Sequence, residues 1–325
     1  MGFKTNGDSY LYKKQMKKHP EKRLKISISV IVLLICFFFI GKSFFVNLHD
    51  VDFHKLKFDW IFLFLSLACI LLGGLINGWL WQINLIYIGE KISYIQSLRV
   101  ISLSYLPKYI PGKVFGIASQ VWLTKEEGSI SGTKGSIGAI LNMGVSILGG
   151  ALLGCSILPF VLKNKLPINI YFLLGFIPVL FIILYPPIFI RASNWFLKIL
   201  KRDIITFIPH YGQILKLLFL NISFWIFQTI AIFFLIRSFY PIGLSFLVPL
   251  CGIFPGASVI ALLSFFTPGG LGVREGVLSY LFSFFMPTSI GIVASIVMRL
   301  LGTIGEIILF AIFAKNIKKY VTQTH

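Results

Sequence analysis

Charged residues deep within apolar sequence are the side chains of this chain that could do chemistry. Arg274, Glu275, Arg299 and Glu306 all lie in long apolar runs, and Lys113 lies between two such runs. Ionisable residues are costly at membrane depth and usually face a cavity or one another, so each is a candidate functional residue. Arg and Lys in such a place favour an anionic group, and the planar fork of Arg suits a phosphate.

Two of these residues follow an interruption in an apolar run. Residues 266–276, with the sequence FTPGGLGVREG, interrupt the apolar stretch 241–285. The proline ends a helix, and the glycines that follow allow positive φ angles and close approach of another group. Irregular backbone at membrane depth is tolerated where it is buried in protein or lines a wet cavity. We therefore expect a substrate-binding segment here, with Pro268, Gly269, Gly270, Gly272, Arg274 and Glu275 as its residues.

A second interruption lies far upstream, at residues 106–116, which have the sequence LPKYIPGKVFG. Interrupted segments in corresponding places of two halves point to the binding site of a transporter. The helix that restarts after each break presents free N–H groups and a positive dipole end, which favour anions. We expect Lys113 and Arg274 to bind a lipid phosphate, with Lys108 nearby. The alternative for the two lysines is that they extend to the cytoplasmic surface.

The last apolar run carries Arg299 and Glu306. They are seven residues apart, so they share one helix face, with Thr303 between them. One interpretation is an internal ion pair that holds helices together. The other is a site for a headgroup or an ion, and the sequence leaves both open.

The composition is that of a membrane protein. Of 325 residues, 57% are hydrophobic and 13% are charged, and the net charge is +19. Such an excess of Lys and Arg is typical of cytoplasmic loops and suits anionic lipid headgroups. The basic residues are dispersed through short loops, which argues against a nucleic-acid partner. The spacing of Cys and His residues indicates no metal site, and we expect no cofactor and no catalytic residue.

Long apolar runs separated by loops rich in Lys and Arg predict an all-α polytopic fold. We expect a basic cytoplasmic tail (1–25), a single transmembrane domain (26–314) and a cytoplasmic C-terminal tail (315–325). Within the domain we expect six full spans and two re-entrant hairpins: spans at 26–45, 60–87, 135–162, 170–190, 217–236 and 287–314, and hairpins at 92–122 and 241–285. The first hairpin would enter from the cytoplasm and the second from outside. The halves 26–162 and 170–314 would then form an inverted repeat.

Three finer expectations follow from the same runs. Trp79 and Trp81 should lie at the inner interface as part of an aromatic belt. The glycines within 135–162 should let neighbouring helices pack closely. Apolar residues alternate with charges in the cytoplasmic linker 191–216, so part of it should lie along the membrane surface.

Residues 268–276 resemble the signature of the lysylphosphatidylglycerol synthase transmembrane-region family, the flippase part of MprF-type proteins. Residues 106–114, residues 125–128 and Arg299 are similar to other recurring elements of that family. The resemblance extends over about residues 25–315. It implies a membrane protein that handles an aminoacylated phospholipid or a polyprenyl-linked glycan intermediate. Synthases of the family continue into a soluble aminoacyl-transfer domain, whereas this sequence ends at His325, so we do not expect it to be an enzyme.

We therefore expect a flippase-type lipid translocase in the cell membrane, with both termini cytoplasmic. Its partners would be membrane lipids with an anionic headgroup or a polyprenyl phosphate. A homo-oligomer, and a separate lipid-modifying enzyme or glycosyltransferase, remain open as further partners. One alternative is a membrane-embedded transferase acting on a lipid-linked sugar, with Glu275 as its base. The other is an ion-coupled carrier for a small anion.

Overall fold

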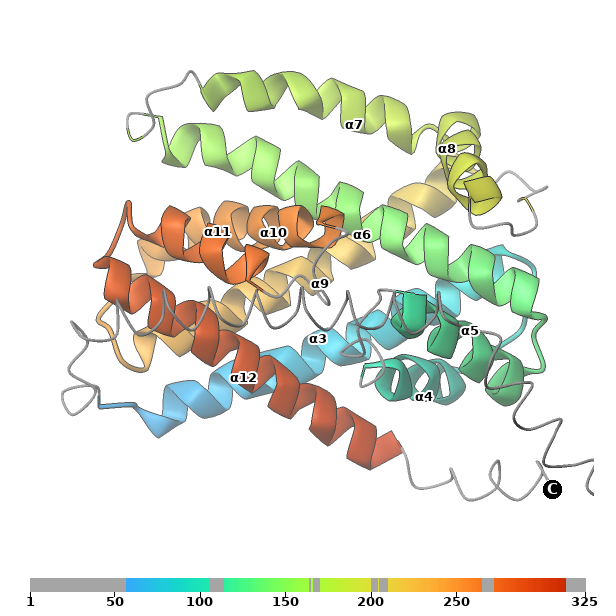
Figure 1. Cartoon of the computed structure of the whole chain (residues 1–325), viewed down its shortest axis with the longest axis horizontal. Helices are drawn as coiled ribbons and strands as arrows, with labels where there is room; N and C mark the ends of the chain where they lie inside the picture. Colours follow the sequence, from blue (N-terminus) through green and yellow to red (C-terminus); the bar gives the residue numbers. More distant parts are fainter. Residues whose placement is uncertain are drawn as a thin grey trace, which may run out of the picture.

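Long helices dominate the structure. The computed structural model describes residues 57–105, 114–163, 165, 170–199, 204, 210–264 and 272–313. Within these residues all regular secondary structure is helical (Figure 1). Four helices are long: α3 (Trp60–Tyr87), α6 (Gly132–Val161), α9 (Tyr211–Arg237) and α12 (Thr288–Phe313). At 1.5 Å per residue each is about 39–45 Å long, more than the ~30 Å thickness of a bilayer core.

Five described segments are long and apolar enough to cross a membrane. They are the four long helices and the segment Leu244–Leu263, which joins the short helix η4 (Leu244–Phe246) to α10 (Leu247–Leu263). A bent pair, Tyr171–Leu184 with Pro186–Ala192, would make a sixth. The prediction of an all-α polytopic membrane protein is thus confirmed. The count of six full spans stays a prediction, because the expected span 26–45 and both expected tails lie outside the described residues.

The first interrupted segment forms two short helices, α4 (Tyr94–Ser104) and α5 (Val114–Gly128). A capping box starts α4, in which the Ser93 hydroxyl accepts from the backbone N–H of Gln96. With 11 and 15 residues, these helices are about 17 and 23 Å long, too short to cross alone. They pack on each other and lie toward the end of the molecule where α3 ends and α6 begins (Figure 1).

The second interrupted segment is arranged in the same way toward the opposite end. It consists of α10 and the 10-residue helix α11 (Val273–Phe282), which pack on each other. Figure 1 shows this pair toward the end of the molecule where α9 ends and α12 begins. The segment Leu244–Leu263, which the sequence analysis placed within a hairpin, is by itself long enough for a crossing.

Glycines of α6 bring it close to two other helices, as expected. A Cβ atom at Gly149 would lie 2.5 Å from the side-chain oxygen of Asn221 on α9. A Cβ atom at Gly154 would lie 3.2 Å from the Cα of Gly256 on α10. Without side chains the backbones can approach closely, which is how small residues stabilise helix pairs in membranes.

The expected straight span 170–190 is bent. A short helix η3 (Ile170–Gly175) and α7 (Phe176–Leu184) are followed by α8 (Pro186–Ile199), and the chain turns by 89° between α7 and α8. Tyr185 has an extended backbone, with ψ of 123°, because a residue before proline disfavours the helical conformation. The helix α8 therefore begins at Pro186, before the expected linker, and extends into it. Arg191 and Lys198 of α8 are exposed, and its position along a membrane surface stays a prediction.

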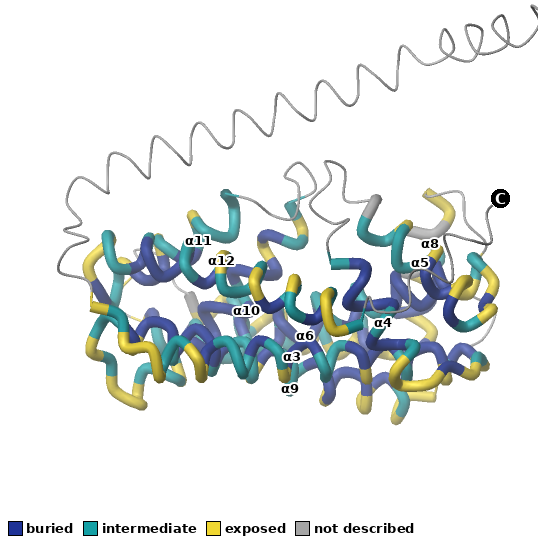
Figure 2. Tube along the Cα trace, turned by 90° about the horizontal axis from the view of Figure 1, so that it is seen from below, coloured by how far each residue is buried: buried dark blue, intermediate teal, exposed yellow. Residues whose placement is uncertain are grey.

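Buried residues lie mostly where the helices face one another, and exposed residues lie mostly on the outer sides of the bundle (Figure 2). Trp79 is 46% exposed, as an interfacial residue would be, but Trp81 is fully buried in the core. The expectation for Trp81 was wrong. Residues two apart on an α-helix are separated by about 200°, so these two tryptophans cannot share the lipid-facing side.

Candidate functional site

The helix α11 starts at a glycine in a conformation that few other residues adopt. Gly272 has a φ of +83°, which L-residues with a side chain disfavour. Its backbone N–H donates to Oε2 of Glu275 at 2.8 Å. Glu275 therefore caps its own helix, and its negative charge lies at the positive end of the helix dipole.

Arg299 on α12 holds the other oxygen of the same carboxylate. Its Nη1 donates to Oε1 of Glu275 at 2.9 Å. The side chains are 18% and 12% exposed, respectively, so the pair is largely shielded. One carboxylate thus joins the start of α11 to the middle of α12, with both of its oxygens accepting hydrogen bonds.

Arg274 approaches a different helix. Its guanidinium carbon lies 4.6 Å from the ring centroid of Phe254 on α10, within range of a cation–π interaction. The three helices α10, α11 and α12 are therefore joined at the point where the chain resumes after the second break. A guanidinium beside a helix start is also a suitable place for an anion.

The acidic partner that the structure gives Arg299 comes from another helix. Helical spacing allowed an ion pair of Arg299 with Glu306 on the same helix as one interpretation. In the structure Arg299 forms its ion pair with Glu275, and the Thr303 hydroxyl donates to the backbone carbonyl of Arg299 at 3.0 Å. The ion pair therefore joins α11 to α12 and does not run along one face of α12.

Glu306 belongs to the surroundings of the first break. It lies close enough to Tyr105, the last residue described before that break, to interact with it electrostatically. The Tyr105 hydroxyl also accepts from Nδ2 of Asn77 on α3 at 3.3 Å. The helix α12 thus carries Arg299 beside the second break and Glu306 beside the first, about 10.5 Å apart along its axis.

The structure brings together only part of the predicted site. Glu275 contacts both Gly272 and Arg299 directly, while Arg274 and Glu306 take part in separate contacts. Five predicted residues lie outside the described residues, and their role stays a prediction: Lys108, Lys113, Pro268, Gly269 and Gly270. Sequence reasoning missed Asn77 and Tyr105; the signal for Tyr105 was its place directly before the break.

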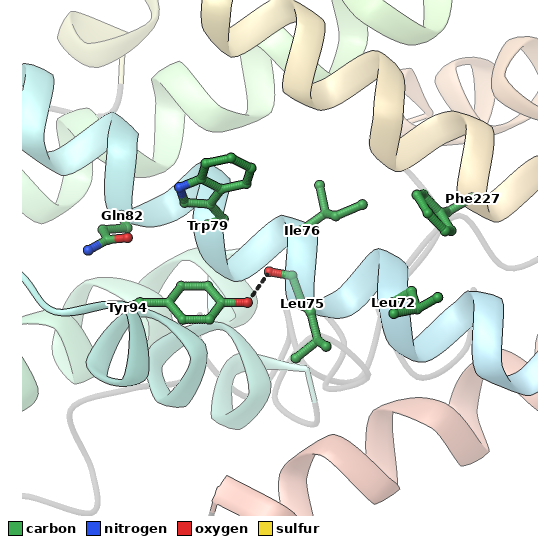
Figure 3. Close-up of a pocket in the computed structure, with 7 residues that line it drawn as sticks. All are labelled: Leu72, Leu75, Ile76, Trp79, Gln82, Tyr94 and Phe227. Carbon is green, nitrogen blue, oxygen red and sulfur yellow. Dashed lines mark hydrogen bonds between the residues drawn. The ribbon is translucent and has the colours of Figure 1, made fainter.

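An apolar groove of about 510 Å³ runs along the outer side of α3. Leu72, Leu75, Ile76, Trp79 and Gln82 of α3 line it, with Tyr94 of α4 at one end and Phe227 of α9 at the other (Figure 3). The Tyr94 hydroxyl donates to the backbone carbonyl of Leu75 at 3.1 Å, so its polar group is already satisfied. The groove has the size of a typical ligand pocket, and its lining suits an apolar chain.

Comparison with protein families gives a match over most of the chain. Residues 24–309 match the family described as lysylphosphatidylglycerol synthase TM region. The chain belongs to this family. The resemblance noted in its sequence is therefore confirmed. No curated protein matches the chain.

Another element of resemblance to the synthase family, residues 125–128, has a structural role. Glu127 is buried and pairs with Arg99 of α4 at 3.4 Å, and its backbone carbonyl accepts from the Gln96 side chain. Lys134 of α6 pairs with Glu90, just after α3. The first two contacts join α4 to α5, and the third joins the start of α6 to the turn after α3.

Proposed function

We propose that this member of the synthase TM-region family is a lipid translocase. Its substrate would be an anionic or aminoacylated phospholipid, or a polyprenyl-linked glycan intermediate. The observation that supports this best is the group of Arg274, Glu275 and Arg299 at the start of α11, within a bundle of apolar helices. Ionised groups in such a place are expensive, and they usually mark a substrate path.

The geometry of this group favours an anionic headgroup. Glu275 and Arg299 form an ion pair, so their charges offset each other. Arg274 packs against an aromatic ring and adds its positive charge to that of the helix start. A phosphate approaching this helix start would meet a guanidinium that can donate two parallel hydrogen bonds.

The same contacts count against the transferase alternative. Both oxygens of Glu275 already accept hydrogen bonds, one from a guanidinium and one from the backbone. Such a carboxylate serves as an anchor rather than as a general base. The groove on α3 has a lining that suits the acyl chain of a lipid substrate.

The proposal includes an inverted repeat of the halves 26–162 and 170–314. In this arrangement the α4–α5 pair enters from the cytoplasm, the α10–α11 pair enters from outside, and both termini are cytoplasmic in the cell membrane. The placement of the two pairs toward opposite ends of the molecule supports it (Figure 1). Alternating access would then be a movement of one half against the other around a site between the breaks.

The proposal is tested by lipid identity and lipid affinity together. Mass spectrometry of lipids that copurify in mild detergent should find an anionic, aminoacylated or polyprenyl phosphate lipid. Binding of a short-chain form of that lipid should weaken in Arg274→Gln by roughly ten- to a hundredfold, the loss of about 1.5–3 kcal/mol for a charge-assisted hydrogen bond. Arg274→Lys keeps the charge and should lose less.

The exposed Arg191 of α8 offers a matched control, because Arg191→Gln removes the same charge from a residue outside the proposed site. Inorganic phosphate as a competitor separates a lipid handler from a small-anion carrier: it should displace the lipid only weakly. A well-folded Arg274→Gln protein with unchanged lipid affinity would remove Arg274 from the site. Strong competition by phosphate would favour the carrier.

A further inference from the structure

One side of α12 is apolar and uncovered by any described residue. Leu300, Ile304, Ile307 and Ala311 are all exposed and recur at helical spacing along it. In the most apolar 18-residue stretch of α12 only 17% of the residues are buried, whereas in the equivalent stretch of α9 50% are buried. Figure 1 shows α12 along one edge of the molecule, while α7 runs beside α6 along the opposite edge.

The helix contacts are nearly unchanged when the two halves are exchanged. In this correspondence between the two halves, α3 is equivalent to α9, α4 to α10, α5 to α11 and α6 to α12. Each contact then has a counterpart that the structure contains: α3–α4 with α9–α10, α5–α6 with α11–α12, α6–α9 with α12–α3, α6–α10 with α12–α4, and α3–α6 with α9–α12. The contact α3–α9 is its own counterpart.

One set of contacts has no counterpart among the described residues. Helices η3 and α7, the segment that precedes α9, pack on α6. Since α9 is equivalent to α3 and α6 to α12, the segment that precedes α3 should pack on α12. That segment contains the 20-residue apolar run 26–45. We propose that residues 26–45 form a helix that covers the exposed side of α12, in the way that α7 covers α6.

The connecting chain is long enough for this arrangement. Residues 46–59 lie between the apolar run and α3, and 14 residues can reach about 46–50 Å. Trp60 and Thr288, the first residues of α3 and α12, lie toward the same end of the molecule (Figure 1). Residue 45 should therefore lie near the start of α12 and residue 26 near its end.

The α6 contacts also give the register. The ring of Phe160, the second-last residue of α6, lies 6.3 Å from the ring of Tyr171, the second residue of η3. The equivalent second-last residue of α12 is Ile312. Its neighbours should be the first residues of the apolar run, which include Ser27 and Ser29.

Disulfide crosslinking tests this placement in the full-length protein. Cysteines replace Ser27 or Ser29 together with Ile312, in a background whose four native cysteines are changed to alanine. Disulfides form only when Cβ atoms come within about 3.5–4.5 Å, so a crosslink reports direct contact. After mild oxidation of membranes, mass spectrometry should find linked peptides in at least one of the two pairs.

Two control pairs make the result decisive. Ile70→Cys with Gly305→Cys, on α3 and α12, should crosslink and shows that the conditions suffice, because the two Cβ atoms would lie 3.7 Å apart. Ser29→Cys with Phe160→Cys joins opposite edges and should not crosslink. Isotope-labelled and unlabelled protein expressed in the same membranes distinguish links within one chain from links between chains. If the control pair at Ile70 and Gly305 links and neither of the two Ile312 pairs does, or if Ile312→Cys links only to a second copy, the placement is wrong.

Discussion

Replacing Glu275 by glutamine is the perturbation that the structure defines most sharply. The change keeps the shape of the side chain and removes its charge. It leaves Arg299, which is 18% exposed, without the carboxylate that holds it at 2.9 Å. Removing one partner of a buried ion pair costs about 3–5 kcal/mol, and the partial exposure places this pair near the lower end. We expect the free energy of unfolding of Glu275→Gln to fall by about 3 kcal/mol.

Thermal unfolding in detergent measures this loss. A loss of about 3 kcal/mol should lower Tm by about 4–5 °C for a chain of this size. Glu126→Gln is the matched control, because Glu126 is exposed on α5 and its charge is solvated. The control should change Tm by much less.

A double-mutant cycle separates the ion pair from other effects. Arg299→Gln alone should destabilise as Glu275→Gln does, because each leaves a shielded charge unpaired. The double variant removes both charges and should recover about 1–3 kcal/mol relative to the sum of the single changes. If the single effects simply add, the two residues do not act as a pair and the account of this contact fails.

Three further predictions concern the breaks, the helix packing and the topology. Replacing Gly269 and Gly270 together by leucine should abolish transport while protein still reaches the membrane, since side chains would block close approach there; normal transport by the reconstituted variant would show that this segment does not line the path. Gly154→Leu should reduce the yield of folded protein, measured by gel filtration in detergent, because even a Cβ added there would lie 3.2 Å from the Cα of Gly256; an unchanged yield and Tm would contradict the close contact of α6 and α10. Cysteines at positions 5 and 320 should be labelled from the cytoplasm only, as the Lys and Arg excess predicts; labelling from outside in intact cells would overturn the inverted topology.

The breaks were predictable because proline and glycine act locally. Two prolines four residues apart, as in the first break, or a proline followed by several glycines, as in the second, favour a helix end. A single proline does not suffice, because α6 and α10 continue through Pro159 and Pro255. The sequence therefore predicted the short helices α4, α5 and α11. The Tyr185 bend carried the same signal in Pro186 and Pro187, but the apolar run continued past it and was interpreted as one span.

The partner of Arg299 could not be predicted in this way. Helical spacing relates a residue only to neighbours on its own helix, which is why Glu306 was considered. Glu275 lies 24 residues away on a separate helix, and only the packing of α11 on α12 brings it within 2.9 Å. For the same reason the sequence did not predict the contact of Arg274 with Phe254, since the ring belongs to α10.

Lipid translocation by purified protein tests the central claim most directly. Vesicles with a fluorescent short-chain form of the copurified lipid are mixed with a membrane-impermeant quencher, and the rate at which inner-leaflet lipid becomes accessible is measured. The wild-type protein and Arg191→Gln should speed this exchange, Arg274→Lys should keep part of the rate, and Arg274→Gln should lose at least about tenfold. If wild-type vesicles exchange anionic, aminoacylated and polyprenyl phosphate lipids no faster than protein-free vesicles, the protein is not a translocase for these lipids.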